Sequence, residues 1–175
     1  MSPDLPTLET ARLRLYPYRH ADFEDYAAMW ADPAVVRFIT GTPFTREQSW
    51  GRFLRLAGHW QFQGFGTFRL EDKATGAYVG ECGFHDLKRE LAPSLEGTLE
   101  GGWALNAAYH GKGLATEAMQ AVTAWADRQH PTLRQTCLID TTNAGSQRVA
   151  AKLGFTEFAR TDYLGKPVVL LERRR

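Results

Sequence analysis

The spacing of hydrophobic residues at the start of the chain predicts one strand and two helices. Leu13 and Leu15 alternate with arginines in ARLRLYPY, the period-2 pattern of a half-buried strand that Pro17 ends. Residues 20–32 carry apolar side chains at helical spacing with acids early. Residues 45–60 repeat this spacing, and Thr45 with Gln48 predicts a capping box at the start of that helix.

The residue pattern in the middle of the chain predicts β-strands. Residues 64–72 and 77–87 predict an antiparallel hairpin that turns at residues 74–76, and the polar stretch 88–98 predicts a loop. The strand LEGGWAL follows at 99–105. Glycines in a strand interior favour a bulge or a close backbone approach, so we expect one of these at Gly101 and Gly102.

The last third of the chain completes the α/β (α+β) pattern. Residues 115–129 predict a helix that ends at His130-Pro131, and 133–140 predict a strand. Residues 144–153 predict a helix capped by Asn143, and residues 154–164 and 166–174 predict two closing strands. The order β α α β β β α β α β β predicts a mixed sheet of six to seven strands flanked by about four helices, in one domain over residues 1–175.

Composition and charge reduce the number of functions and partners that the sequence favours. The chain has 21 basic and 20 acidic residues among 175, so no global field favours nucleic acid or an anionic membrane as a partner. Cys82 and Cys137 are far apart, without metal or redox spacing, and the five histidines show no ligand pattern. We expect reduced thiols, no metal and, because no apolar run is long enough to span a bilayer, a cytoplasmic protein.

The stretch YHGKGLATEA, at 109–118, is the first candidate for chemistry. Amides at a helix start have no intrahelical partner and can hold an anion, and Gly111 and Gly113 let the backbone approach it. A Walker loop is excluded because Gly113 follows Lys112 where Ser or Thr is required. A dinucleotide fingerprint is weak because Thr116 stands where a third glycine belongs. A pyrophosphate site and a plain turn both remain open.

A second segment, NAGSQRVAAKLGF at 143–155, distinguishes these readings. Together with LETARLRLYPY, ADPAVVRFITG and WALNAAYHGKGLATEA, in this order, it resembles the GNAT superfamily of acyl-CoA-dependent N-acetyltransferases. The resemblance covers nearly the whole sequence and is greatest to the branch of the RimJ and RimL ribosomal-protein acetyltransferases. It implies a mostly antiparallel sheet splayed at its central strands. It also implies acetyl transfer from acetyl-CoA to a protein N-terminus or a small-molecule amine, in a ternary complex.

The resemblance also implies roles for individual residues. Main-chain N–H groups of the loop would hold the pyrophosphate, and the central strand would run beside pantetheine. His110 is a departure, because the family has Arg or Gln there, and it contacts either phosphate or water. Asn143 is a helix cap, a cofactor contact or both, and Lys152 caps its helix or reaches the adenosine phosphates. The expected cofactor-binding residues are Trp103, Ala104, Leu105, His110, Gly111, Lys112, Gly113, Leu114, Ala115, Thr116, Asn143, Ser146 and Lys152.

The expected catalytic residues are Glu100, Ser146 and Glu81. Acyl transfer needs a neutral amine, so a base must take a proton; Glu100 is the first candidate and Glu81 the reserve. Relatives carry a tyrosine acid one turn along the last helix, where this chain has Val149 and Ala150, so Ser146 takes that role. A main-chain N–H near Leu105 is the expected oxyanion donor.

The acceptor is expected between the first two helices and the sheet edge. Trp30, Phe38, Phe84 and His85 lie in the segments that would surround it, although the same residues suit a hydrophobic core. Near-neutral charge does not separate a peptide N-terminus from a small amine, and both a monomer and a homodimer fit. Two other functions stay open: an acyl-CoA sensor without turnover, and an NAD(P)-binding oxidoreductase.

Overall fold

A computed structural model describes residues 5–174 as one eight-stranded sheet with helices on both faces. Its strands are β1 (Leu8–Glu9), β2 (Leu13–Pro17), β3 (Thr67–Asp72), β4 (Tyr78–His85), β5 (Leu99–Leu105), β6 (Gln135–Asp140), β7 (Phe155–Tyr163) and β8 (Lys166–Arg173). Its helices are α1 (Phe23–Trp30), α2 (Pro33–Val36), α3 (Arg46–Gln63), α4 (Leu114–Gln129) and α5 (Ala144–Lys152), with short 3-10 turns at His20–Asp22 and Ala107–Tyr109.

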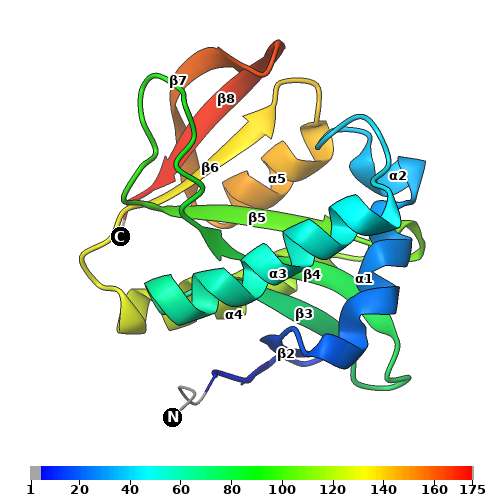
Figure 1. Cartoon of the computed structure of the whole chain (residues 1–175). Coiled ribbons are helices and arrows are strands. Elements are labelled where there is room, and N and C mark those ends of the chain that lie inside the picture. The colour runs from blue at the N-terminus through cyan, green and yellow to red at the C-terminus, as the bar shows by residue number, and fades with distance from the viewer. Residues whose placement is uncertain (1–4, 175) are drawn as a thin grey trace.

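The sheet is antiparallel except at its centre. The strand order is β1-β2-β3-β4-β5-β6-β8-β7, and β5 and β6 form the single parallel pair among the described strands. This pair holds only through Leu99 opposite Gln135 and Glu100 opposite Thr136, although β5 continues for five more residues and β6 for four. Figure 1 shows β6 rising away from β5 beyond the point where they meet. The predicted splay of the central strands is therefore present.

The splay does not arise at the two glycines of β5, where the sequence predicts a bulge or a close backbone approach. The ladder between β4 and β5 runs without a register shift past Gly101 and Gly102, so the predicted bulge is absent there. A register shift occurs instead between Leu70 and Glu71, in the pairing of β3 with β4. Gly101 is a site of close approach, because a Cβ there would lie 3.4 Å from Met119 Cε on α4. The opening arises on the other edge of β5, where β6 diverges.

Two hydrophobic clusters mark the two faces of the sheet. The larger joins the strands to α4, with Ala118, Met119 and Val122 fully buried. The smaller packs α1, α2 and α3 together around Tyr26 and Trp30. In Figure 1, α1 and α3 lie on the near side of the sheet, and α5 lies beside β6. Within the described part of the chain, none of the helices has the length and apolar character needed to cross a bilayer.

The structure has one more strand and one more helix than the sequence pattern predicts. The two-residue β1 pairs with β2, and the four-residue α2 begins at Pro33 with Asp32 as its cap. Both are too short to show a hydrophobic period. The local predictions are otherwise confirmed: Thr45 and Gln48 form the capping box of α3, and β5 spans the predicted seven residues.

Replacing Gly83 with alanine is expected to destabilise the fold. A Cβ at this position would overlap the Gly66 carbonyl oxygen and lie 2.7 Å from Thr67 Cα, so β3 and β4 would have to separate. We expect a loss of about 1–3 kcal/mol in the free energy of unfolding, measured by urea denaturation. Gly51→Ala is the matched control: no atom lies within 4 Å of the new Cβ, and this helical position should gain about 0.5–1 kcal/mol. Equal stability of the two variants would contradict this packing.

Candidate active site

A cleft of about 540 Å³ opens where β5 and β6 diverge. On the β4–β5 side its lining includes Glu81, His85, Glu100, Trp103 and Ala104, while β6 and α5 contribute residues on the far side. Residues from α3 and from the loop after β4 cover it. The cleft therefore connects the two faces of the sheet.

The expected cofactor residues fall into two groups. Trp103, Ala104, Asn143 and Ser146 line the cleft, together with the expected base candidates. The loop residues His110, Gly111, Lys112, Gly113, Leu114, Ala115 and Thr116, and also Leu105 and Lys152, are outside the lining. The loop nevertheless connects directly to the end of β5 through the 3-10 turn at Ala107–Tyr109, so it follows the strand that carries Trp103 and Ala104.

The loop before α4 has the backbone geometry of an anion site. Gly111 and Gly113 adopt left-handed φ values of 74° and 77°, and Gly113 caps the helix without any side-chain hydrogen bond. The first amides of α4 are therefore not occupied by a side-chain cap. His110 Nε2 lies 2.8 Å from the Leu105 carbonyl oxygen, so this ring ties the loop to β5. Lys112 Nζ lies 5.2 Å from the centre of the Tyr109 ring.

Glu117 anchors this loop to the start of the sheet. Its carboxylate accepts hydrogen bonds from Thr10 Oγ1 at 2.6 Å, Arg12 N at 2.9 Å and Arg12 Nε at 2.7 Å. Arg12 Nη1 in turn donates to the Lys112 carbonyl at 3.0 Å. Burial alone would raise the pKa of Glu117, but these hydrogen bonds outweigh it and hold the pKa below its ordinary value. No local pattern in the sequence links residues this far apart.

Ser146 meets the central strand across the opening. The Trp103 indole N–H donates to Ser146 Oγ at 3.2 Å, and Ser146 N donates to Asn143 Oδ1 at 3.1 Å. Asn143 is thus the predicted cap of α5. Because the indole N–H uses a lone pair of Oγ, the hydroxyl proton remains available for a group in the cleft.

Glu81 is a buried carboxylate held by two partners. It is 4% exposed, pairs with Arg52 Nη2 at 3.1 Å and accepts a hydrogen bond from Tyr18 at 3.0 Å. Tyr18 also shares a hydrogen bond of 2.6 Å with Tyr78. Burial raises the pKa of Glu81 above its ordinary value, and Arg52 opposes only part of that effect. A buried carboxyl group with a raised pKa is a frequent mark of acid–base chemistry.

Glu100 is held more completely. Arg89 Nε lies 2.9 Å and 2.8 Å from its two oxygens, and Arg89 Nη2 lies 2.7 Å from Oε1. Both oxygens thus face one guanidinium from the loop after β4. Sequence reasoning missed Arg89, because nothing in its polar loop marks it as a partner of β5.

His85 completes this face of the cleft, opposite Glu100 in the β4–β5 ladder. Burial, followed by the nearby Arg52 and His59, lowers the pKa of His85 well below its ordinary value. Its Nδ1 is buried, and no atom of residues 5–174 hydrogen-bonds to it. Trp30 and Phe38 also line the cleft, whereas Phe84 points to the opposite face and is fully buried in the core.

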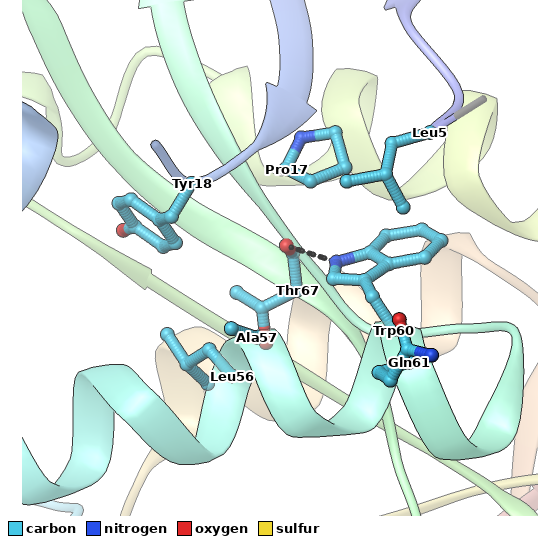
Figure 2. Close-up of a pocket in the computed structure, with 8 residues that line it drawn as sticks. All are labelled: Leu5, Pro17, Tyr18, Leu56, Ala57, Trp60, Gln61 and Thr67. Atoms are coloured by element: carbon cyan, nitrogen blue, oxygen red, sulfur yellow. Dashed lines mark hydrogen bonds between the residues drawn. The ribbon is translucent and has the colours of Figure 1, made fainter. Parts of the chain in front are cut away.

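A second, smaller cavity of about 190 Å³ lies beside α3 (Figure 2). Figure 2 shows the Trp60 indole between Leu5 and Pro17 above and the α3 side chains below, with its N–H donating to the Thr67 carbonyl at 3.0 Å. Among residues 5–174, the side chains that line this cavity include neither a carboxylate nor a basic group. Thr67 also lines the main cleft, so the two spaces adjoin at this residue. Of these two spaces, as lined by residues 5–174, the main cleft is the one with carboxylates and a histidine.

The described residues can be compared with the side-chain groups that bind metal ions. Among residues 5–174, no group of three or more His, Cys, Asp or Glu side chains could hold a metal ion. Cys82 and Cys137 are buried free thiols in separate strands.

Comparison with known proteins agrees with this geometry. The family model described as "Acetyltransferase (GNAT) domain" matches residues 12–156. The N-acetyltransferase p20 of Bacillus licheniformis, itself uncharacterised, is 30% identical over 117 residues, which are 66% of this chain and 63% of that protein. The chain thus spans under two thirds of that relative's length.

Solved structures extend the comparison over nearly the whole chain. A structure assigned to the GNAT-family acetyltransferases from Bordetella pertussis is 34% identical, with a TM-score of 0.87 over 97% of this chain and 99% of that one. RimL, a ribosomal L7/L12 α-N-protein acetyltransferase solved with coenzyme A, shares the fold at 15% identity, with a TM-score of 0.79 over 96% of this chain and 97% of that one. The protein described here is a member of the GNAT acetyltransferase family, an acyltransferase that uses acetyl-CoA.

Proposed function

We propose that this enzyme transfers the acetyl group of acetyl-CoA to a primary amine by direct attack within a ternary complex. The observation that carries the proposal is the divergence of β5 and β6, which brings Ser146 and Glu81 into one cleft that opens on both faces of the sheet. The domain would extend over residues 1–175, because β7 and β8 lie mostly beyond the matched residues and complete the sheet through β6.

The backbone of β5 would bind the pantetheine arm of acetyl-CoA. Leu99 N donates to Arg134 on the β6 side, whereas Asn106 N donates to Val79 on the β4 side. Because N–H groups alternate along a strand, those of Trp103 and Leu105 point into the opening. These two amides are placed to pair with an extended ligand, and the Leu105 N–H suits the expected oxyanion donor. The uncapped amides from Gly111 to Thr116 would hold the pyrophosphate.

The residues of the cleft then have distinct roles. The neutral amine nitrogen attacks the thioester carbonyl carbon, the C–S bond breaks, and the amine proton passes to Glu81, directly or through one water. Ser146 donates a hydrogen bond to the departing thiolate, and the proton that Glu81 took from the amine passes through water to this thiolate, which leaves as free CoA. Glu81 replaces Glu100 as the proposed base, because Arg89 occupies both oxygens of Glu100. Asn143 would hold the first turn of α5, and with it Ser146, in place.

Calorimetry and a thiol-release assay test the proposal together. Acetyl-CoA is expected to bind the folded protein, and a panel of amines and N-terminal peptides should include acceptors that release free CoA. Absence of acetyl-CoA binding would overturn the proposal. Binding without release by any acceptor would favour an acyl-CoA sensor, and stabilisation by NAD(P) rather than acetyl-CoA in a thermal shift assay would favour an oxidoreductase.

Replacing Ser146 with alanine is expected to lower kcat about 10- to 100-fold, because a hydrogen bond to a developing anion is lost. Affinity for acetyl-CoA should change little, since the variant retains the backbone N–H that donates to Asn143. Steady-state kinetics and calorimetry measure the two quantities. Ser94→Ala, in the exposed loop after β4, is the matched control and should leave both unchanged. An unchanged kcat in the Ser146 variant would remove this residue from the mechanism.

A further inference from the structure

Three guanidinium groups line the cleft, and one of them lacks a carboxylate partner. Arg52 pairs with Glu81 and Arg89 pairs with Glu100, and these two basic side chains are only 18% and 21% exposed. Arg55 lines the same cleft from α3, and its side chain makes no hydrogen bond or ion pair with any of residues 5–174. Arg55 is exposed to solvent, so its guanidinium is available to a ligand that enters the cleft.

The charges around the cleft do not balance. The lining has four basic side chains, Arg52, Arg55, Arg89 and Lys166, against three acidic ones, Glu81, Glu100 and Asp140. Lys166 lies close enough to Asp140 to contribute to lowering the pKa of that carboxyl group. The two glutamates are already paired with arginines. The remaining positive charge belongs to Arg55.

Two titratable groups near this charge have lowered pKa values, chiefly through burial and then through the neighbouring basic side chains. Burial, followed by Arg52, lowers the pKa of Arg55 itself. His85 has its pKa lowered by the same arginines, after burial, and the neutral ring leaves a buried Nδ1 without a partner. The Arg55 guanidinium has no carboxylate beside it among residues 5–174, so an anion that enters the cleft next to it would be stabilised by its charge.

The position of Arg55 indicates where on the acceptor this anion would be. Arg52 and Arg55 are three residues apart on α3, so they lie on one face about one helical turn apart. Arg52 holds Glu81, which is the proposed base for the attacking amine. An anion on Arg55 would therefore lie on the same side of the cleft as the amine, since the Cβ atoms of the two arginines are roughly 5–6 Å apart. A carboxylate only a few bonds from an amine fits this separation.

We propose that Arg55 binds a carboxylate on the acceptor, and that the substrates are amines with a carboxylate near the reacting nitrogen. This inference rests on the proposed function. Trp30, Phe38 and Phe44 form an apolar wall of the same cleft, which suits an apolar side chain on such an acceptor. The carboxylate is either the α-carboxylate of a free amino acid or an acidic side chain next to a peptide N-terminus.

Matched acceptors test the proposal with wild-type enzyme. Phenylalanine is compared with phenylalaninamide for the first source, and a tetrapeptide beginning Ser-Glu with one beginning Ser-Gln for the second. We expect kcat/KM to favour the carboxylate about 10- to 100-fold in at least one pair. The pair that shows the preference identifies the source. No preference in either pair would overturn the proposal.

Variants of Arg55 assign the preference to this residue. Arg55→Gln should abolish the ratio within the preferred pair, Arg55→Lys should retain part of it, and Arg55→Glu should favour the uncharged acceptor. KM for acetyl-CoA should stay unchanged; an increase that is equal for both acceptors would mean that Arg55 serves the cofactor. Arg128→Gln, on the exposed surface of α4, is the control and should keep the wild-type ratio.

A binding measurement separates this inference from the proposed function. With CoA present, N-acetylphenylalanine and N-acetyl-Ser-Glu should each be compared with their uncharged counterparts by calorimetry. If no acceptor releases CoA, the proposed function fails, but a carboxylate preference that Arg55→Gln abolishes would still support the site. Turnover or binding without that preference would overturn the site alone.

Discussion

Replacing Glu81 with glutamine is expected to lower kcat about 10²- to 10⁴-fold, the usual contribution of a positioned general base. Glutamine keeps the shape of the side chain: its single carbonyl oxygen can accept the hydrogen bond from Arg52, and its amide group can donate to the Tyr18 hydroxyl. It cannot take the proton of the amine. Steady-state release of CoA measures the change, and acetyl-CoA affinity should remain close to that of the wild type.

The pH dependence identifies the residue behind this loss. Because burial raises the pKa of Glu81, the acid limb of kcat/KM in the wild type should lie at higher pH than an ordinary glutamate would give. In the variant that limb should disappear. Glu100→Gln serves as the comparison. The Arg89 guanidinium already engages both oxygens of Glu100, so we expect a smaller loss in kcat and an acid limb of kcat/KM that is still present. The reverse order of the two variants would restore Glu100 as the base.

Stability should also follow the raised pKa of Glu81. The folded state holds the Glu81 proton more tightly than the unfolded state does, so this carboxyl group favours folding most at low pH. Its contribution falls as pH rises from the unfolded pKa through the higher folded pKa. In thermal denaturation, the stability of the glutamine variant should lack this pH dependence. If the variant is folded at every pH tested, its lower kcat reflects loss of the base and not loss of the fold.

Replacing Arg69 with alanine is expected to cost about 3–5 kcal/mol in the free energy of unfolding. Arg69 is 5% exposed in β3 and forms ion pairs with Asp22 at 3.1 Å and Asp25 at 2.9 Å. It also donates to the Tyr16 hydroxyl at 3.1 Å. Removing the guanidinium leaves these acids without their cation and detaches the first helical segment from the sheet.

Differential scanning calorimetry measures the effect of the Arg69 variant. For a domain of this size the loss corresponds to a Tm lower by about 10 °C. Arg160→Ala is the matched control, because its pair with Glu157 is exposed on β7 and contributes within about 0.5 kcal/mol. Equal Tm values for the two variants would show that the buried network is not a source of stability.

The local parts of the fold were predictable because they depend on neighbours in sequence. The capping box of Thr45 requires only the residue three positions later, and Asn143 caps α5 through Ser146 in the same way. The strand at 99–105 is bounded by a polar loop and by the turn after Leu105. The periodicity of hydrophobic residues and the capping residues determine such elements, and both can be identified in the amino-acid sequence.

The composition of the cleft was not predictable, because it depends on contacts between distant segments. In the sequence, Arg52 and Arg55 look like ordinary polar positions of an amphipathic helix. Only the packing of α3 over the sheet places them in the cleft. Glu100 could not be distinguished from Glu81 without knowing which of them a loop arginine occupies. The loss of the expected bulge has a similar origin, since glycines mark only a tolerance for close approach.

The brief contact between β5 and β6 gives the sheet a mechanical seam. One plate of five strands and another of three are joined across it by two residue pairs, so little backbone bonding resists their relative movement. An extended molecule that binds in the seam and forms hydrogen bonds with both plates would restrict the movement of one plate relative to the other. Amide hydrogen exchange should then slow on both sides of the seam at once, including strands that the molecule never touches.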